Sequence, residues 1–374
     1  MNTTLRRQRL ARAVMFCAVL ATSGVAWSAD SAKILAALKV PAGFKVSIYA
    51  DNVPGARSMA LGEHGTLFVG TQAAGKVYAL RSLADGRREV VTVAQGLNRP
   101  NGVAFRDGAL YVAEIQRILR YDAIEGRLES APKPVIVRGD LPTDAHHGWR
   151  YIAFGPDGKL YVPIGAPCNV CDQKGYAVIT RMNPDGSGRE VFASGVRNTV
   201  GFTWHPVTHE LWFTDNGRDY LGDDAPPDEL NRAPGPGLNF GFPFCHGGEI
   251  KDPQFGDLGN CASAIPPARK LGAHVASLGV KFYTGTQFPE TYRNQIFIAE
   301  HGSWNRTQRS GYRVSLVRLQ GDQATGYEPF ISGWNQPDGV LGRPVDLLVL
   351  PDGSMLVSDD LAGVIYQVSY GAAN

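Results

Sequence analysis

Short runs of three apolar residues recur six times along the chain. Turn sequences precede two of them, Gly-Pro-Asp-Gly at residues 155–158 and Pro-Asp-Gly at 351–353, and such turns connect neighbouring β-strands. A further apolar segment follows several runs, as at residues 76–80, 117–121 and 364–368. The pattern predicts antiparallel sheets of three or four strands. The six runs are Leu67-Phe68-Val69, Leu110-Tyr111-Val112, Leu160-Tyr161-Val162, Leu211-Trp212-Phe213, Ile296-Phe297-Ile298 and Met355-Leu356-Val357.

The spacing of these runs indicates the architecture. Successive runs begin 43, 50, 51, 85 and 59 residues apart. A period of about 40–50 residues with three or four strands is typical of a β-propeller blade. We therefore expect an all-β fold, a six-bladed β-propeller, whose closed ring hides most strand edges. The longest interval predicts a long insertion between blades, at about residues 219–269, rich in Gly, Pro and Asp.

The first residues have the pattern of an export signal. Four arginines lie within residues 1–12, no acidic residue precedes Asp30, and an apolar run at 13–21 is followed by small residues. The apolar run is shorter than the ~20 residues of a membrane-spanning helix. We expect an export signal at residues 1–28, a propeller domain at 29–374, a periplasmic or secreted location and no stable membrane insertion. An uncleaved membrane anchor is the alternative.

Composition and charge exclude several classes of protein. Hydrophobic residues make up 44% of the chain, enough to bury a core, which excludes a disordered chain. The 44 glycines have no three-residue period, which excludes collagen. The 37 basic and 35 acidic side chains leave a net charge of +2, so no nucleic-acid partner is expected.

Four cysteines remain after the export signal. They allow three pairings, of which we expect Cys168–Cys171 and Cys245–Cys261, because the members of each pair are close in sequence. A four-thiolate zinc site is the alternative, since Cys168 and Cys171 have the spacing of zinc ligands. Asp172 stands where a haem attachment motif needs His, so no haem is expected.

Cationic and imidazole side chains precede the first strand of each repeat at similar offsets. Equivalent positions in propeller blades lie at similar radius and height, so we expect these side chains to meet at one rim of the central channel. With the amides of Asn98, Asn101 and Asn198 they would form an anion-binding pocket. Each has a purely structural alternative; His146 and His147 could be a surface pair, and we expect Trp149 and Tyr151 to serve the core. The predicted rim residues are Arg57, Arg99, His147, Arg197, His274 and Arg343.

Several segments resemble the soluble quinoprotein glucose/sorbosone dehydrogenases, a family that uses pyrroloquinoline quinone (PQQ). The resemblance covers nearly the whole chain after the export signal and is nearest to the sorbosone-dehydrogenase branch. The segments that carry it are His146-His147-Gly148 through residues 155–158, Gly195-Val196-Arg197-Asn198, Asp228-Glu229-Leu230-Asn231, Asn239-Phe240-Gly241-Phe242-Pro243 and the last blade from Gly342-Arg343.

The resemblance implies roles for individual residues. His147 matches the general base that takes the sugar hydroxyl proton, and Arg197 matches the arginine that stabilises negative charge on the quinone. The backbone carbonyls of Gly217 and Arg218 match calcium ligands. PQQ carries three carboxylates, which a cationic rim suits. The expected cofactor-binding residues are Asn98, Arg99, Asn198, Asp228, His274 and Arg343.

The chain departs from the family pattern at three places. Ala166 stands where glucose-oxidising members have an aspartate that orients the histidine, so we expect His147 to be less basic and less fixed unless another acid, Asp144 or Asp215, substitutes. Val345 stands in place of a second arginine. A family lysine has no clear counterpart, and His301 or Arg306 are the candidates for its place.

The sequence therefore predicts an exported PQQ- and calcium-dependent oxidoreductase. It would oxidise an aldose or a related sugar aldehyde or hemiacetal by hydride transfer to the quinone, and then pass electrons to a cytochrome or a quinone. Two alternatives stay open: a calcium-dependent lactonase-type hydrolase, suggested by the segment at residues 100–105, and a non-catalytic binding propeller. Fold alone does not separate them, because function resides in the site.

Overall fold

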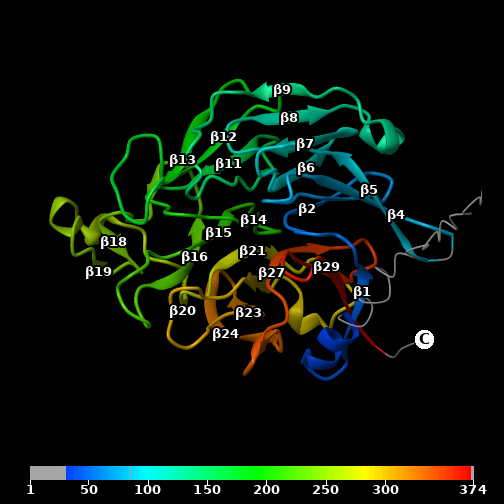
Figure 1. Ribbon diagram of the computed structural model, residues 1–374. Helices are drawn as coiled ribbons and strands as arrows, with labels where there is room; N and C mark the ends of the chain where they lie inside the picture. Colours follow the sequence, from blue (N-terminus) through cyan, green and yellow to red (C-terminus); the bar gives the residue numbers. More distant parts are fainter. Residues whose placement is uncertain (1–30, 85, 372–374) are drawn as a thin grey trace, which may run out of the picture.

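The computed structural model describes residues 31–84 and 86–371. Six antiparallel sheets are arranged around a central axis (Figure 1), and all six predicted apolar runs are second strands of these sheets. The prediction of a six-bladed β-propeller is confirmed. Blade 1 contains β2 (Met59–Leu61), β3 (Leu67–Val69), β4 (Val77–Ser82) and β5 (Arg88–Ala94). Blade 2 contains β6 (Gly102–Arg106), β7 (Ala109–Ala113), β8 (Ile118–Tyr121) and β9 (Val135–Arg138).

The remaining blades follow in chain order. Blade 3 contains β10 (Ala153–Phe154), β11 (Leu160–Ile164), β12 (Val178–Met182) and β13 (Glu190–Ser194), and blade 4 contains β14 (Phe202–Trp204), β15 (Leu211–Asp215), β16 (Pro227–Ala233) and β20 (Arg269–Ala273). Blade 5 contains β21 (Ser277–Phe282), β22 (Ile296–Glu300), β23 (Arg313–Gln320) and β24 (Gln323–Ile331), and blade 6 contains β27 (Pro344–Val349), β28 (Met355–Asp359), β29 (Val364–Tyr370) and β1 (Phe44–Ala50).

Short elements decorate this ring. Residues 31–37 are helical. Two small hairpins are formed by β18 (Cys245–His246) with β19 (Ile250–Lys251), and by β25 (Asn335–Gln336) with β26 (Gly339–Val340). The 3-10 turns are η1 (Ile124–Gly126), η2 (Leu128–Ser130), η3 (Gly256–Leu258), η4 (Cys261–Ser263) and η5 (Glu290–Tyr292).

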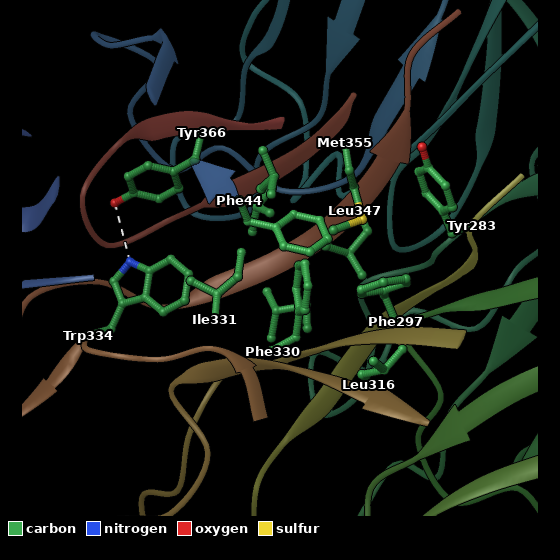
Figure 2. Packing of buried hydrophobic residues seen from close by; sticks show 14 of the residues in the cluster. Phe44, Tyr283, Phe297, Leu316, Phe330, Ile331, Trp334, Leu347, Met355 and Tyr366 are labelled. Atoms are coloured by element: carbon green, nitrogen blue, oxygen red, sulfur yellow. Dashed lines mark hydrogen bonds between the residues drawn. The ribbon is translucent and has the colours of Figure 1, made fainter. Parts of the chain in front are cut away.

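The first strand of the chain closes the ring. β1 pairs antiparallel with β29, from Phe44 opposite Tyr370 to Ile48 opposite Tyr366, and completes blade 6. The ring of Phe44 lies edge-to-face against Phe288 and Phe330, with centroids 4.8 and 4.9 Å apart. Figure 2 shows Phe44 among the side chains of blades 5 and 6. Strand pairing and aromatic packing together hold the two ends of the propeller, without a covalent link.

Six apolar clusters of the described core lie one at each interface between neighbouring blades. Successive side chains along a strand point to opposite faces of the sheet. Each second strand therefore contributes side chains to the apolar clusters on both sides of its blade. In β15, Leu211 and Phe213 pack toward blade 3, whereas Trp212 packs toward blade 5. Both faces are buried, which explains why the second strands appear as unbroken apolar runs. Near the axis the blades converge, and a Cβ on Gly279 would lie 2.6 Å from Asp346 Cα.

The long insertion lies within a blade rather than between two blades. Residues 234–268 separate β16 from β20, and β20 pairs with β16 to complete blade 4. The predicted range also contained β16 itself, a regular strand. Part of the insertion does reach the preceding blade, because β17 (Leu238–Asn239) pairs parallel with β13 as a fifth strand. The sequence pattern did not reveal β20, because it follows the insertion rather than a recognisable turn.

Both predicted disulfides are present, Cys168–Cys171 and Cys245–Cys261. Their formation uses all four sulfurs, so the four-thiolate zinc alternative is wrong. The predicted export signal, residues 1–28, lies outside the described residues. No helix in the part of the chain that the structure describes is long and apolar enough to cross a membrane.

Candidate active site

One cavity of about 820 Å³ lies where the six blades meet. Its lining residues come from all six blades, so the cavity is on the propeller axis. The predicted rim is assembled as expected, since every one of its six members lines this cavity: Arg57, Arg99, His147, Arg197, His274 and Arg343. A volume of this size is typical of a small-molecule or cofactor site.

A second set of lining residues was not predicted from the sequence, except that His301 was named as a candidate for the place of the family lysine. Gln72, Asn216, His301 and Asp360 follow the second strands β3, β15, β22 and β28, and all line the same cavity. The loops after second strands and the loops before first strands therefore open on one face. The ends of the second strands were visible in the sequence, and comparing the residues after them would have found this set.

Three rim residues have backbone conformations that are rare for residues other than glycine. Arg99, His147 and His274 have φ values of 51°, 48° and 58°. The left-handed region is disfavoured for side chains with a Cβ, and such residues concentrate at functional sites. The loops before β6, β10 and β21 therefore hold cationic or imidazole side chains at some conformational cost.

His147 is oriented by a backbone carbonyl. Its Nδ1 lies 2.8 Å from the carbonyl oxygen of Ala166. A carbonyl only accepts, so Nδ1 carries the proton and Nε2 is free to accept one. Burial, reinforced by the positive charge of Arg197, holds the pKa of His147 well below its usual range. The imidazole is therefore neutral at pH 7, as a general base requires.

The expected carboxylate substitutes for the missing aspartate have other partners. Asp144 accepts a hydrogen bond from the hydroxyl of Tyr176. Asp215 accepts the backbone N–H groups of Arg197 and Asn198, at 2.8 and 2.6 Å. Neither Asp144 nor Asp215 substitutes as the group that orients His147, because the Ala166 carbonyl already occupies Nδ1. Asp215 instead fixes the backbone of the neighbouring rim loop.

Arg197 lies beside His147 and is held by several acceptors. Its side chain is 4% exposed. The guanidinium donates to Asn169 and Asn216, and its Nη2 lies 3.2 Å from Asp219 Oδ2. Burial lowers the pKa of Arg197, while the charge of Asp219 opposes this change. The result is a buried, directed cation at the cavity wall.

The other cations differ in whether a carboxylate neutralises them. Arg57 pairs with Asp360 at 2.5 Å, and Asp360 also contacts His301 at 2.8 Å. Among residues 31–84 and 86–371, Arg343 donates only to backbone carbonyls, those of His301 and Gly302. Arg99 has no side-chain partner among the described residues. Arg99 and Arg343 are thus the rim cations with charge available for an anionic ligand.

Asp228 and Gly217, one of the two predicted calcium ligands, lie together at the cavity wall, and Arg218 follows Gly217 in the chain. Asp228 accepts the N–H of Gly217 at 2.9 Å and that of Ser277 at 3.1 Å. Burial raises its pKa to about 7. The carbonyl oxygens of Gly217 and Arg218 accept no hydrogen bond from the described residues. Oxygen donors of this kind suit calcium.

Not every predicted site residue faces the cavity. Asn198, Asp228 and Gly217 line it, whereas Asn98 and Arg218 do not. The side-chain amide of Asn98 donates to Gln116 at 2.8 Å, which turns it away. The guanidinium of Arg218 lies 2.5 Å from Asp252 in the insertion, so only its backbone remains as a ligand candidate.

Of the two aromatic residues expected in the core, Tyr151 lies there and Trp149 does not. Tyr151 is buried and its hydroxyl accepts from Lys281, as expected for a core residue. Trp149 lines the cavity, contrary to expectation. It packs there against a small apolar floor formed by Val200, Leu278 and Val345.

The structure also shows where the histidine pair lies, and where the two candidates for the position of the family lysine lie. His146 and His147 both line the cavity, with ring centroids 4.0 Å apart; His147 is buried, whereas His146 is exposed at the surface. Of the two candidates for the lysine position, His301 lines the cavity. Arg306 instead binds Asp223 and Asp224 in the loop after β15.

Comparisons with known proteins agree with this architecture. A protein of Borreliella burgdorferi described only as uncharacterized is 36% identical over 354 residues, covering 90% of this chain and 92% of that protein. The PQQ-dependent pyranose dehydrogenase of Coprinopsis cinerea is 30% identical over 133 residues, 30% of this chain and 18% of that protein.

Solved structures share the fold. The holo form of the Coprinopsis pyranose dehydrogenase PQQ domain has a TM-score of 0.76 at 20% identity, over 89% of this chain and 97% of that one. The calcium structure of the Trichoderma reesei family AA12 enzyme gives the same values. Two family models match the sequence: TrAA12-like at residues 250–371, and glucose / sorbosone dehydrogenase at residues 113–303, which is half of the chain. The chain therefore belongs to the glucose/sorbosone dehydrogenase family.

Proposed function

We propose that this protein is an exported, PQQ- and calcium-dependent dehydrogenase that oxidises an aldose or a related sugar aldehyde or hemiacetal. The observation that carries the proposal is the pairing of two neighbouring groups at the cavity wall. A neutral His147, with Nε2 free to accept a proton, lies beside the buried cation of Arg197. A base next to a charge stabiliser is what removal of a hydroxyl proton with loss of hydride requires.

The positive charge of the cavity rim suits the negatively charged cofactor. PQQ is a tricarboxylate, and the rim offers Arg99 and Arg343 without carboxylate partners. Asn198 also lines the cavity, and Trp149 offers an aromatic surface. When bound, PQQ accepts the hydride of the substrate as a two-electron oxidant. The Coprinopsis and Trichoderma proteins, whose structures are described as holo and calcium forms, support the pair of cofactors.

Calcium would be held mainly by backbone oxygen atoms. The carbonyls of Gly217 and Arg218 are the donors whose lone pairs no described residue uses. Among residues 31–84 and 86–371 no group of three or more His, Cys, Asp or Glu side chains is placed to hold a metal ion. From this chain, the proposed site would therefore rely on backbone carbonyls, with Asp228 nearby, where it accepts the Gly217 N–H.

The residues of this chain have distinct tasks in the proposed reaction. His147 receives the hydroxyl proton of the substrate at Nε2, while the Ala166 carbonyl keeps Nδ1–H in place. Arg197 offers its positive charge to oxygen atoms that gain negative charge during oxidation. His301 and Asp360, which form a hydrogen-bonded pair at the cavity wall, orient polar groups of the ligand.

Aromatic rings at the cavity mouth support a sugar substrate. Trp304 lines the cavity and is 66% exposed; Tyr220 is 70% exposed and meets it edge-to-face, with centroids 5.9 Å apart. Their loops are tied together by Arg306–Asp224 and by Thr307 N–H to Asp223. Exposed, preorganised rings of this kind can pack against the C–H face of a pyranose.

The proposed location is the periplasm or the extracellular space. The two disulfides support an oxidising compartment. We propose an export signal at residues 1–28, followed by the propeller domain at 29–374. In that location a cytochrome or a quinone is the proposed electron acceptor.

Titration of the purified apo-protein with PQQ and calcium tests the proposal. We expect a saturable one-to-one change in absorbance, followed by reduction of the bound quinone when aldoses are added. Absence of binding with calcium present would contradict the proposal, and lactone hydrolysis in the same preparation would support the hydrolase alternative. Binding without reduction by any of a panel of aldoses and sugar aldehydes would support a binding propeller instead.

A further inference from the structure

We propose that Asn169, held in a ring closed by the Cys168–Cys171 disulfide, is a positioning residue for the guanidinium of Arg197. The inference rests on the proposed importance of Arg197 in the site. It assigns a purpose to the Cys-x-x-Cys sequence, which is used neither as a zinc site nor for haem attachment.

Asn169 contacts Arg197 through both its backbone and its side chain. The Asn169 carbonyl accepts from Arg197 Nε at 2.8 Å, and its Oδ1 accepts from Nη2 at 2.9 Å. One residue thus binds two of the three guanidinium nitrogens. Hydrogen bonds to a charged group are stronger than neutral ones, and two at fixed positions define the orientation of the planar group.

The same side chain also fixes the carboxylate next to Arg197. Asn169 Oδ1 accepts the N–H of Asp219 at 2.8 Å, and its Nδ2 donates to the Asp219 carbonyl at 3.1 Å. Asp219 in turn lies 3.2 Å from Arg197 Nη2. Asn169 therefore links the loop after β11 to the loop after β15. It fixes the positions of both the Arg197 guanidinium and the Asp219 backbone beside it.

The disulfide is what restrains Asn169. Residues 165–177, between β11 and β12, contain no helix or strand. Asn169 and Val170 are enclosed between two cysteines three positions apart. A loop without regular structure loses much conformational entropy when ordered, and a covalent ring around Asn169 removes part of that freedom in advance. Without the ring, the carbonyl and the amide would have to be ordered by their hydrogen bonds alone.

Removing Asn169 is expected to free Arg197 rather than to unfold the protein. Arg197 would keep its bonds to the Asn216 carbonyl and to Asp219. N169A also keeps the backbone carbonyl, whereas loss of the disulfide loosens both acceptors of residue 169. The double variant C168S/C171S should therefore disturb Arg197 more than N169A does. N169D keeps an oxygen acceptor for Nη2 but loses the Nδ2–H bond to the Asp219 carbonyl, so it should disturb Arg197 less than N169A does.

The test uses an arginine-selective dicarbonyl on the full-length apo-protein, with peptide mass mapping of the adduct at Arg197. We expect modification about tenfold faster in N169A, the scale of one lost hydrogen bond to a charged group, faster still in C168S/C171S, and between the wild-type and N169A rates in N169D. N183A is the matched control, because Asn183 lies in an exposed loop of the same blade and bonds only locally, to Ser187. Modification needs neither cofactor nor substrate, so its result is independent of the proposed function.

A double-mutant cycle separates positioning from a general loss of stability. If the disulfide acts through Asn169, N169A adds little to the modification rate in the C168S/C171S background. Equal rates in N169A and wild type would overturn the proposal. Full additivity of the two changes would also overturn it, because the disulfide would then act elsewhere. Thermal unfolding of each variant identifies any that fails to fold, and N169A with the disulfide intact tests the proposal in that case.

Discussion

The carbonyl oxygen of Ala166 lies 2.8 Å from His147 Nδ1 and takes the place of an orienting carboxylate. A carbonyl does not ionise, so it fixes the tautomer at every pH at which the protein is folded. It adds no negative charge to stabilise the imidazolium, and burial keeps the pKa of His147 low. The base is therefore well oriented but weak.

This relationship predicts a spectroscopic signature. In the apo-protein, ¹⁵N correlation spectra should show His147 as the neutral Nδ1–H tautomer from pH 8 down to below pH 6.5. The pKa is lowered, so the neutral form persists below the usual titration point of histidine. A protonated His147 at pH 7, or an Nε2–H tautomer, would contradict the orientation described above.

Replacing the proposed base should remove turnover but not cofactor binding. His147→Ala should lower kcat by about 10²- to 10⁴-fold, the usual contribution of a general base. The PQQ affinity should change little, because the expected carboxylate contacts are made by Arg99 and Arg343. Steady-state kinetics and PQQ titration measure the two effects, with exposed His209 replaced by Ala as control. Turnover like that of wild type would refute the assigned role.

Removal of two rim cations should lower the free energy of unfolding by very different amounts. Arg57→Ala leaves the partly buried Asp360 with His301 as its remaining side-chain partner, removes the donor to Asn101 Oδ1, and should cost about 1–3 kcal/mol of unfolding free energy. Arg99→Ala breaks no ion pair, so its cost should stay within about 0.5 kcal/mol while PQQ binding weakens. Denaturant unfolding of both variants checks the difference, and equal costs would contradict it.

Asp359 should make stability depend on pH. Burial raises its pKa to about 6, although it accepts N–H bonds from Arg343 and Ala362. The raised pKa means that the folded state favours the protonated form, so this contribution is present below pH 4 and lost as the pH rises through 6. Relative to wild type, D359N should gain about 3 kcal/mol between pH 4 and pH 8. Denaturant unfolding across this range is the measurement, and a constant difference would argue against it.

The aromatic pair at the mouth should affect long substrates more than short ones. Trp304→Ala should raise KM for a disaccharide about tenfold and for a monosaccharide much less, with kcat nearly unchanged. The reason is that ring stacking acts on the part of the substrate outside the cavity. Leu258→Ala, at a position 73% exposed in the insertion, is the control. An equal rise for both sugars would show that Trp304 contacts the reacting ring.

Local pattern was sufficient for the fold and for much of the rim. Runs such as residues 211–213 are apolar because both strand faces are buried between blades, so the repeat is visible without any partner being known. The rim residues could be aligned because each precedes a first strand at a similar offset. Cys168 and Cys171 were paired correctly because so short a separation leaves few alternatives.

Side-chain direction and long-range pairing were decided by the assembled ring. The sequence does not show that Asn98 turns to Gln116, that Trp149 faces the cavity, or that the Ala166 carbonyl replaces an aspartate. Nor does it reveal β20 beyond its insertion, or the contact of Asn169 with Arg197 across 28 positions. These features depend on which loops the closed propeller brings together, and no periodicity along one chain segment records that. The strands follow from local burial, whereas the chemistry of the site depends on loops from all six blades meeting at one axis.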